Sequence, residues 1–133
     1  MSSAIPESYR DLLRDEVRAF ALLATTMADG SPQVTPLWFD VDGEVLRLNT
    51  ARGRTKERNM RARPRMALAI LDPTNPYRYV QIRGTVIELR EQGAPEHIRL
   101  LSRKYRGSDV FPIPDGQVRV MVFVRPDHVS VTG

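Results

Sequence analysis

The sequence predicts a mainly β (α+β) protein in which six or seven short antiparallel strands form a barrel with a few short helices. Three observations support this fold class. Short β-type segments follow one another in hairpin order, the pairs Asp29-Gly30 and Asp42-Gly43 provide turns between them, and little of the chain has helical periodicity. The 133 residues contain no repeat or linker, which predicts one domain over residues 1–133 with room for a sizeable core.

The first half of the chain predicts one short helix and three strands. The helix spans residues 6–16, because Pro6 suits a first helical position and Tyr9, Leu12 and Leu13 share one face. Strands are expected at residues 18–27, 33–41 and 44–50, separated by the two Asp-Gly turns.

The second half predicts two helices and four strands. A basic helix follows the third strand and ends near Pro64, and an amphipathic helix over 94–105 ends at Gly107. In the long strand 77–90, Gly84 marks a bulge or a close backbone approach. The other expected segments are a buried strand at 65–71, loops at 72–76 and 108–116, and closing strands at 118–124 and 128–131.

The junction of the third strand with the basic helix, residues 49–59, carries the clearest functional signal. Six cations and a single acid, Glu57, fall within residues 52–63; the cations are Arg52, Arg54, Lys56, Arg58, Arg61 and Arg63. A helix start offers unpaired N–H groups and the positive end of the dipole, so added cations predict an anion site, most plausibly for phosphate. Helical spacing separates the cations, so the expected contacts are Thr50, Arg54, Thr55 and Lys56. An ordinary solvated basic surface remains the alternative.

Composition narrows the classes of function. The net charge of +4 and the pI near 10.0 come largely from one focused patch, which suits a compact anionic ligand better than nucleic acid. There is no cysteine, no Walker or dinucleotide glycine motif and no apolar stretch that could cross a membrane. The start of the chain lacks the pattern of a secretory leader, so a cytoplasmic protein is expected.

Histidines and aromatic residues give weaker signals. His97 is expected on the surface of its helix and His128 is expected to be structural or exposed, so neither a metal site nor a hydrolytic triad is predicted. Four aromatic residues could flank a planar ring, although ordinary packing is favoured for any one of them: Trp38, Phe39, Tyr77 and Tyr79.

Several segments together resemble one family. They are VTPLWF at 34–39, DG at 42–43, NTARGRTKERN at 49–59, DPTNPYRYV at 72–80, IRG at 82–84 and RPDHVSVTG at 125–133. In this order and spacing the chain resembles the flavin/deazaflavin oxidoreductases of the pyridoxamine 5′-phosphate oxidase-like superfamily. The resemblance extends over nearly the whole chain and is strongest to the short branch that uses the deazaflavin coenzyme F420.

The resemblance implies a split β-barrel that works as a homodimer, with cofactor clefts at the subunit interface. It implies that Lys56, with Arg54 and Thr50, binds the cofactor phosphate, and that the strand from Pro36 to Trp38 runs beside the ring. Tyr79 falls where the superfamily often places a cofactor contact. The expected cofactor-binding residues are therefore Thr35, Pro36, Trp38, Thr50, Arg54, Thr55, Lys56 and Tyr79. No catalytic residue is assigned.

The function that follows is an F420-dependent oxidoreductase that transfers a hydride to an electron-poor small molecule. The cations Arg52 and Arg58 would suit the long anionic tail of F420. An FMN-dependent oxidoreductase of the same fold and a non-catalytic cofactor carrier remain alternatives, as does a nucleic-acid binder that uses the basic helix. Pyridoxamine phosphate oxidases proper have a further C-terminal segment that this sequence lacks, so oxidation of vitamin B6 is not expected.

Overall fold

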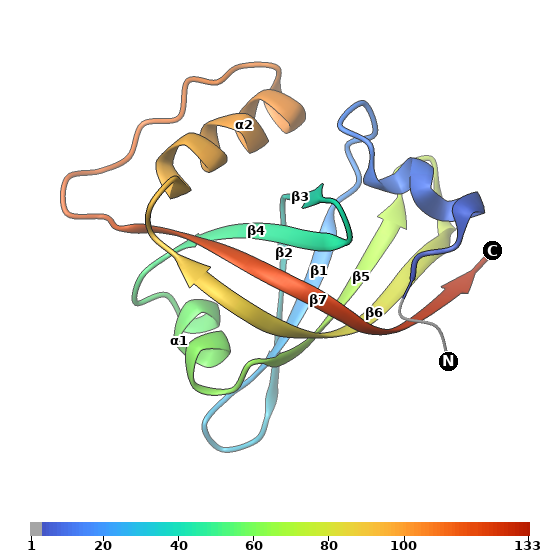
Figure 1. The fold of residues 1–133 in the computed structure, drawn as a ribbon, viewed down its shortest axis with the longest axis horizontal. Helices are drawn as coiled ribbons and strands as arrows, with labels where there is room; N and C mark the ends of the chain where they lie inside the picture. Colours follow the sequence, from blue (N-terminus) through green and yellow to red (C-terminus); the bar gives the residue numbers. More distant parts are fainter. Residues whose placement is uncertain (1–3) are drawn as a thin grey trace.

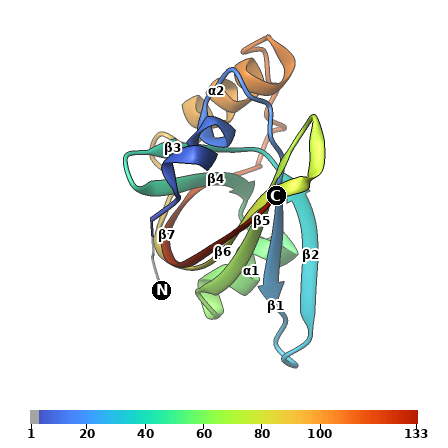
Figure 2. The same ribbon diagram turned by 90° about the vertical axis from the view of Figure 1, so that its right-hand side faces the viewer.

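The computed structural model describes residues 4–133 and contains one antiparallel sheet that curls into a half-barrel (Figures 1 and 2). The strand order is β2-β1-β5-β6-β7-β4-β3. The strands are β1 (Ala21–Thr26), β2 (Pro32–Leu37), β3 (Phe39–Asp42), β4 (Val45–Ala51), β5 (Arg65–Asp72), β6 (Asn75–Arg90) and β7 (Arg119–Thr132). The helices are η1 (Glu7–Leu13, a 3-10 helix), α1 (Thr55–Ala62) and α2 (Ala94–Arg106). This confirms the predicted fold class, with seven strands.

The hydrophobic core lies inside the curl of the sheet, where alternate residues of each strand point inward. In β4, Leu46 and Leu48 are buried while Arg47 between them is half-buried on the other face. The helix η1 packs against the same core through Leu12 and Leu13, which confirms the apolar face predicted for this segment.

One predicted strand, residues 33–41, is two strands in the structure. Leu37 still pairs with Ala21 of β1, whereas Phe39 pairs with Leu48 of β4, so the chain changes partner at Trp38. The indole of Trp38 stacks on the ring of Tyr105, with ring centroids 5.3 Å apart. The prediction of a single strand was wrong. The side chains of an extended segment continue to alternate between the two faces of the sheet when the segment leaves one neighbouring strand and pairs with another, so the sequence pattern does not mark the change.

Conversely, the two strands predicted at the C-terminal end form one continuous strand, β7. Pro126 lies opposite Gly84 of β6, where the register shifts, so the ladder continues past a residue that cannot donate a hydrogen bond. A side chain at position 84 would meet the carbonyl oxygen of Arg125 at 2.8 Å, which confirms the close approach predicted for Gly84.

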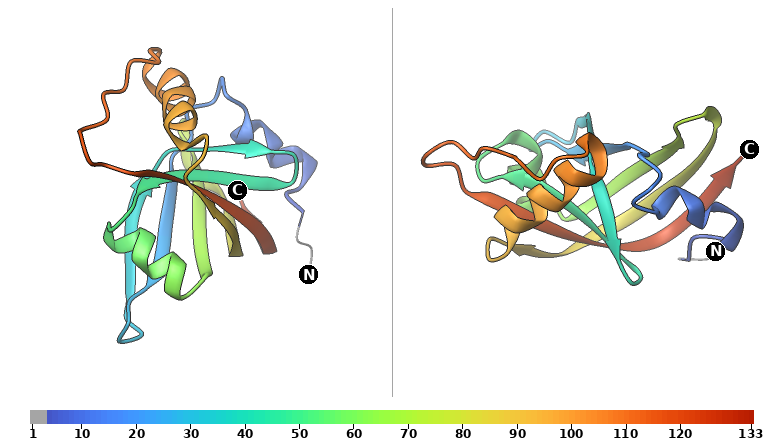
Figure 3. Two further views of the ribbon diagram at one scale, coloured as in Figure 1. Left: turned by 60° about the vertical axis from the view of Figure 1, so that its left-hand side comes forward. Right: turned by 90° about the horizontal axis from the view of Figure 1, so that it is seen from above.

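The helix α2 lies against β4 and β7 at one side of the half-barrel (Figure 3). Its predicted apolar stripe is confirmed, since Ala94, Ile98, Leu101 and Tyr105 are all buried, and Gly107 ends it in the left-handed conformation (φ 76°). Figures 1 and 3 show α1 and the loop before β7 at the end of the molecule away from the two termini. Within residues 4–133, no helix is both long enough and apolar enough to span a bilayer.

Candidate functional site

A cavity of about 290 Å³ lies between the start of α1, strand β4 and helix α2. Its walls come from seven parts of the chain: the residue before β1, β2 and the residue after it, β4, the start of α1, α2, the loop before β7, and β7. The lining residues are Phe20, Pro36, Leu37, Trp38, Asn49, Arg54, Lys56, Ile98, Leu101, Phe111 and Arg119. We call it the cationic cavity, because the charged residues in this set are all basic.

Three cations share this cavity without a neutralising acid. Arg54 is at the N-cap position of α1 and makes no side-chain capping bond, Lys56 lies in the first turn of α1, and Arg119 begins β7. Burial, together with the positive charges of Arg54 and Arg119, lowers the pKa of Lys56. Burial and then Arg54 lower the pKa of Arg119 to about 10. Three positive charges held together in this way favour the binding of an anion.

The other cations of the basic segment are engaged in structural contacts. Arg52 forms an ion pair with Glu91, and Arg61 forms one with Glu57 at 2.6 Å. The remaining two donate to carbonyl oxygens: Arg58 to Gly53 (2.7 Å) and Arg63 to Thr26 (2.7 Å). The charge run therefore divides into four structural cations and two, Arg54 and Lys56, that form no ion pair within residues 4–133 and line the cavity.

The turn before α1 explains why Arg54 and Lys56, the two cations of this segment that line the cavity, are placed there. Gly53 adopts φ 90°, a conformation that glycine adopts readily, and its N–H donates to Oε1 of Glu57 at 2.8 Å. Glu57 is almost fully buried, and it thereby fixes the turn to the first turn of the helix. The N–H groups of the first helical turn have no partner inside a helix, so this end of α1 adds further positive character.

Part of the cavity wall is aromatic. The indole of Trp38 stacks almost parallel to the ring of Tyr105, with an interplanar angle of 5°. Phe111 stands edge-on to Trp38 at 6.3 Å, and the guanidinium of Arg119 lies 5.6 Å from the centre of the Phe111 ring. Flat apolar surface beside a group of cations suits a planar ring that carries a negatively charged tail.

A buried chain of hydrogen bonds extends from Arg119 beneath α2. Arg119 Nε donates to Asn49 Oδ1 (2.9 Å), Asn49 Nδ2 lies 3.1 Å from His97 Nδ1, and His97 Nε2 lies 2.9 Å from Asp40 Oδ1. Arg47 then holds Asp40 through two bonds of 2.9 and 2.7 Å. Burial alone would raise the pKa of Asp40, but the hydrogen bonds from His97 and Arg47 outweigh it and lower that pKa.

The position of His97 in this series of hydrogen bonds contradicts the prediction that it lies on the surface, since only 2% of the residue is exposed. The prediction followed the stripe through Ile98, and His97 lies immediately beside that stripe. The helix buries a second line as well, through Leu101 and Lys104, which are spaced four and seven residues after His97. His128 was predicted to be either structural or exposed, and it is exposed.

Four of the eight predicted cofactor-binding residues line the cationic cavity: Pro36, Trp38, Arg54 and Lys56. Thr35 and Thr50 each bury a hydroxyl oxygen that has no hydrogen-bond partner within the described residues. Thr55 is the first residue of α1. Tyr79 does not line this cavity, because it lies in β6 opposite Leu71 of β5 and Thr132 of β7.

Seven lining residues are outside the predicted set, and three of them are polar or come from the loop before β7: Asn49, Phe111 and Arg119. A signal for Arg119 is present in the sequence, because it is a lone charge at the start of the apolar strand Val118–Val124, and such a charge requires a partner or a ligand. Asn49 immediately precedes the predicted contact Thr50. Phe111 lies in the loop between α2 and β7, for which the sequence gives no position in space.

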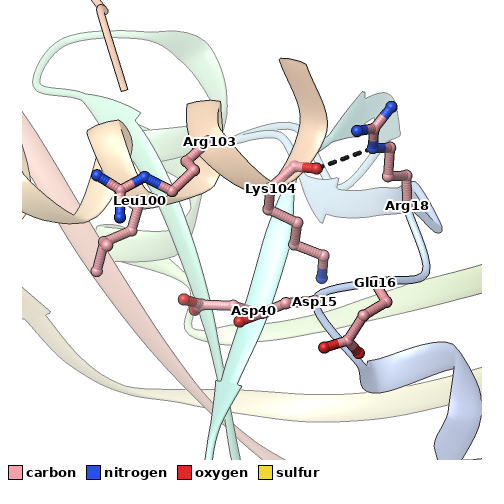
Figure 4. Close-up of a pocket in the computed structure, with 7 residues that line it drawn as sticks. All are labelled: Asp15, Glu16, Arg18, Asp40, Leu100, Arg103 and Lys104. Carbon is pink, nitrogen blue, oxygen red and sulfur yellow. Dashed lines mark hydrogen bonds between the residues drawn. The ribbon is translucent and has the colours of Figure 1, made fainter. Parts of the chain in front are cut away.

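A second and larger cavity, of about 410 Å³, also borders α2 (Figure 4). We call it the Lys104 cavity. It is lined by Asp15, Glu16, Arg18, Asp40, Leu100, Arg103 and Lys104. Lys104 Nζ donates to the carbonyl oxygen of Phe39 at 2.9 Å, and Figure 4 shows its ammonium extending from α2 toward the carboxylates. Three acids thus balance three bases. Within residues 4–133, no three or more His, Cys, Asp or Glu side chains are arranged so that they could hold one metal ion.

Comparison with known proteins gives one family and many similar structures. The family described as pyridoxamine 5′-phosphate oxidase matches residues 5–132. A solved structure named F420 reductase has 40% identity and a TM-score of 0.84, and the alignment covers 95% of this chain and 98% of that one. No curated protein matches significantly.

More distant structures have the same fold. A conserved hypothetical protein from Mycobacterium tuberculosis has 23% identity and a TM-score of 0.71, with 97% of this chain and 85% of that one covered. General Stress Protein 26 from Bacillus anthracis has 14% identity and a TM-score of 0.64, with 92% of each chain covered. Because the family match extends over almost all of the sequence, the chain belongs to the pyridoxamine 5′-phosphate oxidase family and has its split β-barrel fold.

Proposed function

We propose that this protein is an oxidoreductase that binds coenzyme F420 in the cationic cavity and transfers a hydride to an electron-poor small molecule. One observation carries the proposal: Arg54, Lys56 and Arg119 share a cavity that no acid lines, beside the ring of Trp38. The residues fit such a cofactor, since the cations match its phosphate and the aromatic wall matches its planar ring. The similarity to an F420 reductase over 95% of the chain supports the choice of cofactor.

The roles of the residues follow from their places in the cavity. Arg54 and Lys56 bind the phosphate together with the N–H groups at the start of α1, and Trp38 lies along the ring. Thr35 and Thr50 would contribute their hydroxyls, which have no hydrogen-bond partner within the described residues. Thr55, in the first turn, lies beside the phosphate position.

When bound, reduced F420 supplies the hydride from carbon 5 of its ring. The protein's part is to hold the ring and the acceptor in contact and to exclude water. None of the residues that line the cavity is a histidine, aspartate or glutamate. The lining therefore provides orientation and positive charge, and the proton that completes reduction comes from solvent.

We further propose a homodimer that covers the mouth of the cationic cavity. The outer face of β1, β2 and β5 is apolar where a solvated face would be polar. Val34 is 63% exposed and Leu22 38% exposed, and the pairing aligns them with Ala67 and Ala69 of β5. Pro36 belongs both to this face and to the cavity wall, so a second copy packed here would also close the cavity.

The same dimer would give Tyr79 its expected role. Tyr79 is on the outer face of β6, in line with Gln81 and Arg83, two and four residues further along the strand. Tyr79 of the partner subunit is therefore the one that we expect to reach the cofactor. Light scattering tests the dimer, and a folded monomer that binds F420 with full affinity would contradict it.

The function is tested by titrating purified protein with F420 and with FMN, side by side. We expect tighter binding of F420, because three cations suit a ligand that has carboxylates as well as a phosphate. Reduced F420 is then mixed with a panel of quinones and other electron-poor acceptors. Oxidation of F420 above the background rate is expected, whereas tight binding without turnover would indicate a carrier protein. Preferential binding of FMN would support the alternative cofactor, and binding of neither would reject the proposal.

A further inference from the structure

The innermost cation of the cationic cavity, Arg119, does not stand alone. It is 5% exposed, and its guanidinium makes two hydrogen bonds, to Asn49 Oδ1 (2.9 Å) and to Gln117 Oε1 (3.2 Å). Both acceptors are neutral amide oxygens, so they orient the guanidinium without cancelling its charge. A buried cation with neutral partners is costly unless an anion binds it.

Asn49 can orient Arg119 only while its amide is held the right way round. Its Nδ2 donates to the carbonyl oxygen of Ala94 at 2.9 Å, so its Oδ1 must face Arg119. The same Nδ2 lies 3.1 Å from His97 Nδ1, which must then accept a hydrogen bond. A flipped amide would place an oxygen against the oxygen of Ala94 and a donor against Arg119, losing both contacts.

His97 is in turn fixed by Asp40. Because Nδ1 of the imidazole accepts, its proton is on Nε2, which donates to Asp40 Oδ1 at 2.9 Å. Arg47 holds that carboxylate through both of its oxygens. The direction of each hydrogen bond is therefore determined along the whole series of side chains from Arg47 to Arg119. We call Asp40, His97 and Asn49 the relay.

Resting on the proposed function, we propose that Arg119 is a third cationic ligand of the cofactor phosphate, and that His97 is a positioning residue which fixes Arg119 through Asn49. Arg119, Arg54 and Lys56 all line the cavity, and their charges lie close enough to perturb one another. The phosphate would then be held from two sides: by α1 on one and by β7 on the other.

The test compares ligands with and without the phosphate. Dissociation constants are measured by fluorescence titration for F420, for its deazaflavin ring and ribityl chain without phosphate, and for FMN and riboflavin. We expect Arg119→Gln to weaken the phosphorylated ligands about tenfold and the phosphate-free ones less than twofold, as removal of one charged hydrogen bond implies. An equal loss for both kinds of ligand would overturn the assignment of Arg119.

Two substitutions at His97 test the relay. Gln can accept from Asn49 and donate to Asp40, so His97→Gln should bind within threefold of wild type. Phe keeps the size of the ring and removes both hydrogen bonds, so His97→Phe should show most of the phosphate-dependent loss of Arg119→Gln. If His97→Phe does not fold, Asn49→Ser breaks the relay on the β4 side and should give the same loss.

Ser102→Ala is the matched control on α2. Ser102 is fully buried; it donates to the carbonyl oxygen of Ser108 at 2.6 Å and accepts from Arg106 Nε at 3.2 Å, and neither partner belongs to the relay. It should lower the melting temperature without a phosphate-dependent loss. Equal losses of affinity in the Ser102→Ala and His97→Phe variants would overturn the positioning role.

Lys56→Met separates this inference from the proposed function. If Lys56→Met shows a phosphate-dependent loss of affinity and Arg119→Gln does not, only this inference is rejected. If neither variant loses affinity, the proposed function is rejected as well.

Discussion

The two cavities that border α2 carry three cations each, yet only one of them is suited to an anion. In the Lys104 cavity, Asp15, Glu16 and Asp40 offset the cations, and Lys104 already donates to the carbonyl oxygen of Phe39. In the cationic cavity no acid lines the wall. The larger cavity, of about 410 Å³, is therefore the weaker candidate for the cofactor phosphate. Charge compensation, and not volume, distinguishes the two.

The two lysines of the chain allow the sharpest test of this comparison, because each cavity contains one. Lys56→Met should weaken F420 binding by about 10- to 100-fold, the loss of a charge-assisted hydrogen bond to phosphate. Lys104→Met should leave the affinity within threefold of wild type. Fluorescence titration of both variants is the measurement. A larger loss at Lys104 would reverse the assignment of the cavities.

The comparison can be sharpened within the basic segment itself. Arg54 lines the cavity, whereas Arg58 already donates to the carbonyl oxygen of Gly53. We expect Arg54→Gln to weaken F420 binding about tenfold and Arg58→Gln less than threefold. Calorimetric titration of the two variants measures the difference. Equal losses would mean that the helix contributes a diffuse positive field and not a defined site.

Salt provides a smaller and independent effect. Raising the ionic strength screens exposed charges, so wild-type affinity for F420 should fall several-fold between about 0.05 and 0.5 M salt. Because Lys56→Met removes one contributing charge, its affinity should fall less steeply. Titrations at four salt concentrations test this. Parallel slopes for the two proteins would argue against a role for Lys56 in attracting the anion.

The smallest effect concerns the acid at the border of the Lys104 cavity. Because its hydrogen bonds lower the pKa of Asp40, its ionised form stabilises the folded state above the ordinary value of about 3.8. That stability is lost as the pH falls through the lowered pKa. In urea unfolding, the free energy of unfolding should therefore be higher for wild type than for Asp40→Asn at pH 6, and the difference should shrink below pH 4. A difference independent of pH would show that Asp40 acts only through packing.

The sequence predicts the parts of the site that are local in the chain. Arg54, Thr55 and Lys56 could be found because a strand end, a glycine turn and a helix start follow one another within a few residues. Arg119 could not be placed in the same way, since it is 70 residues from Asn49 and meets it only through the pairing of β4 with β7. His97 is 48 residues from Asn49 and depends on the packing of α2.

The fold was predicted more completely than the site, because alternation and turn residues report directly on strands. Where the prediction of strands failed, the cause was a change of partner in one case and an irregularity within a continuous strand in the other. Trp38 separates two strands that were predicted as one, and Pro126 lies within one strand that was predicted as two. The change of partner at Trp38 leaves the alternation of side chains intact, whereas the register shift beside Pro126 interrupts it, so that Val124 and Val129, five residues apart, both lie in the core.

The central claim is that the cationic cavity holds the cofactor phosphate. A crystal structure of the protein with F420 tests it most directly. We expect phosphate oxygens within hydrogen-bond distance of Lys56 Nζ and the guanidinium of Arg54, with the ring along Trp38. A phosphate bound in the Lys104 cavity, or Lys56 turned away into solvent while F420 binds elsewhere, would contradict it.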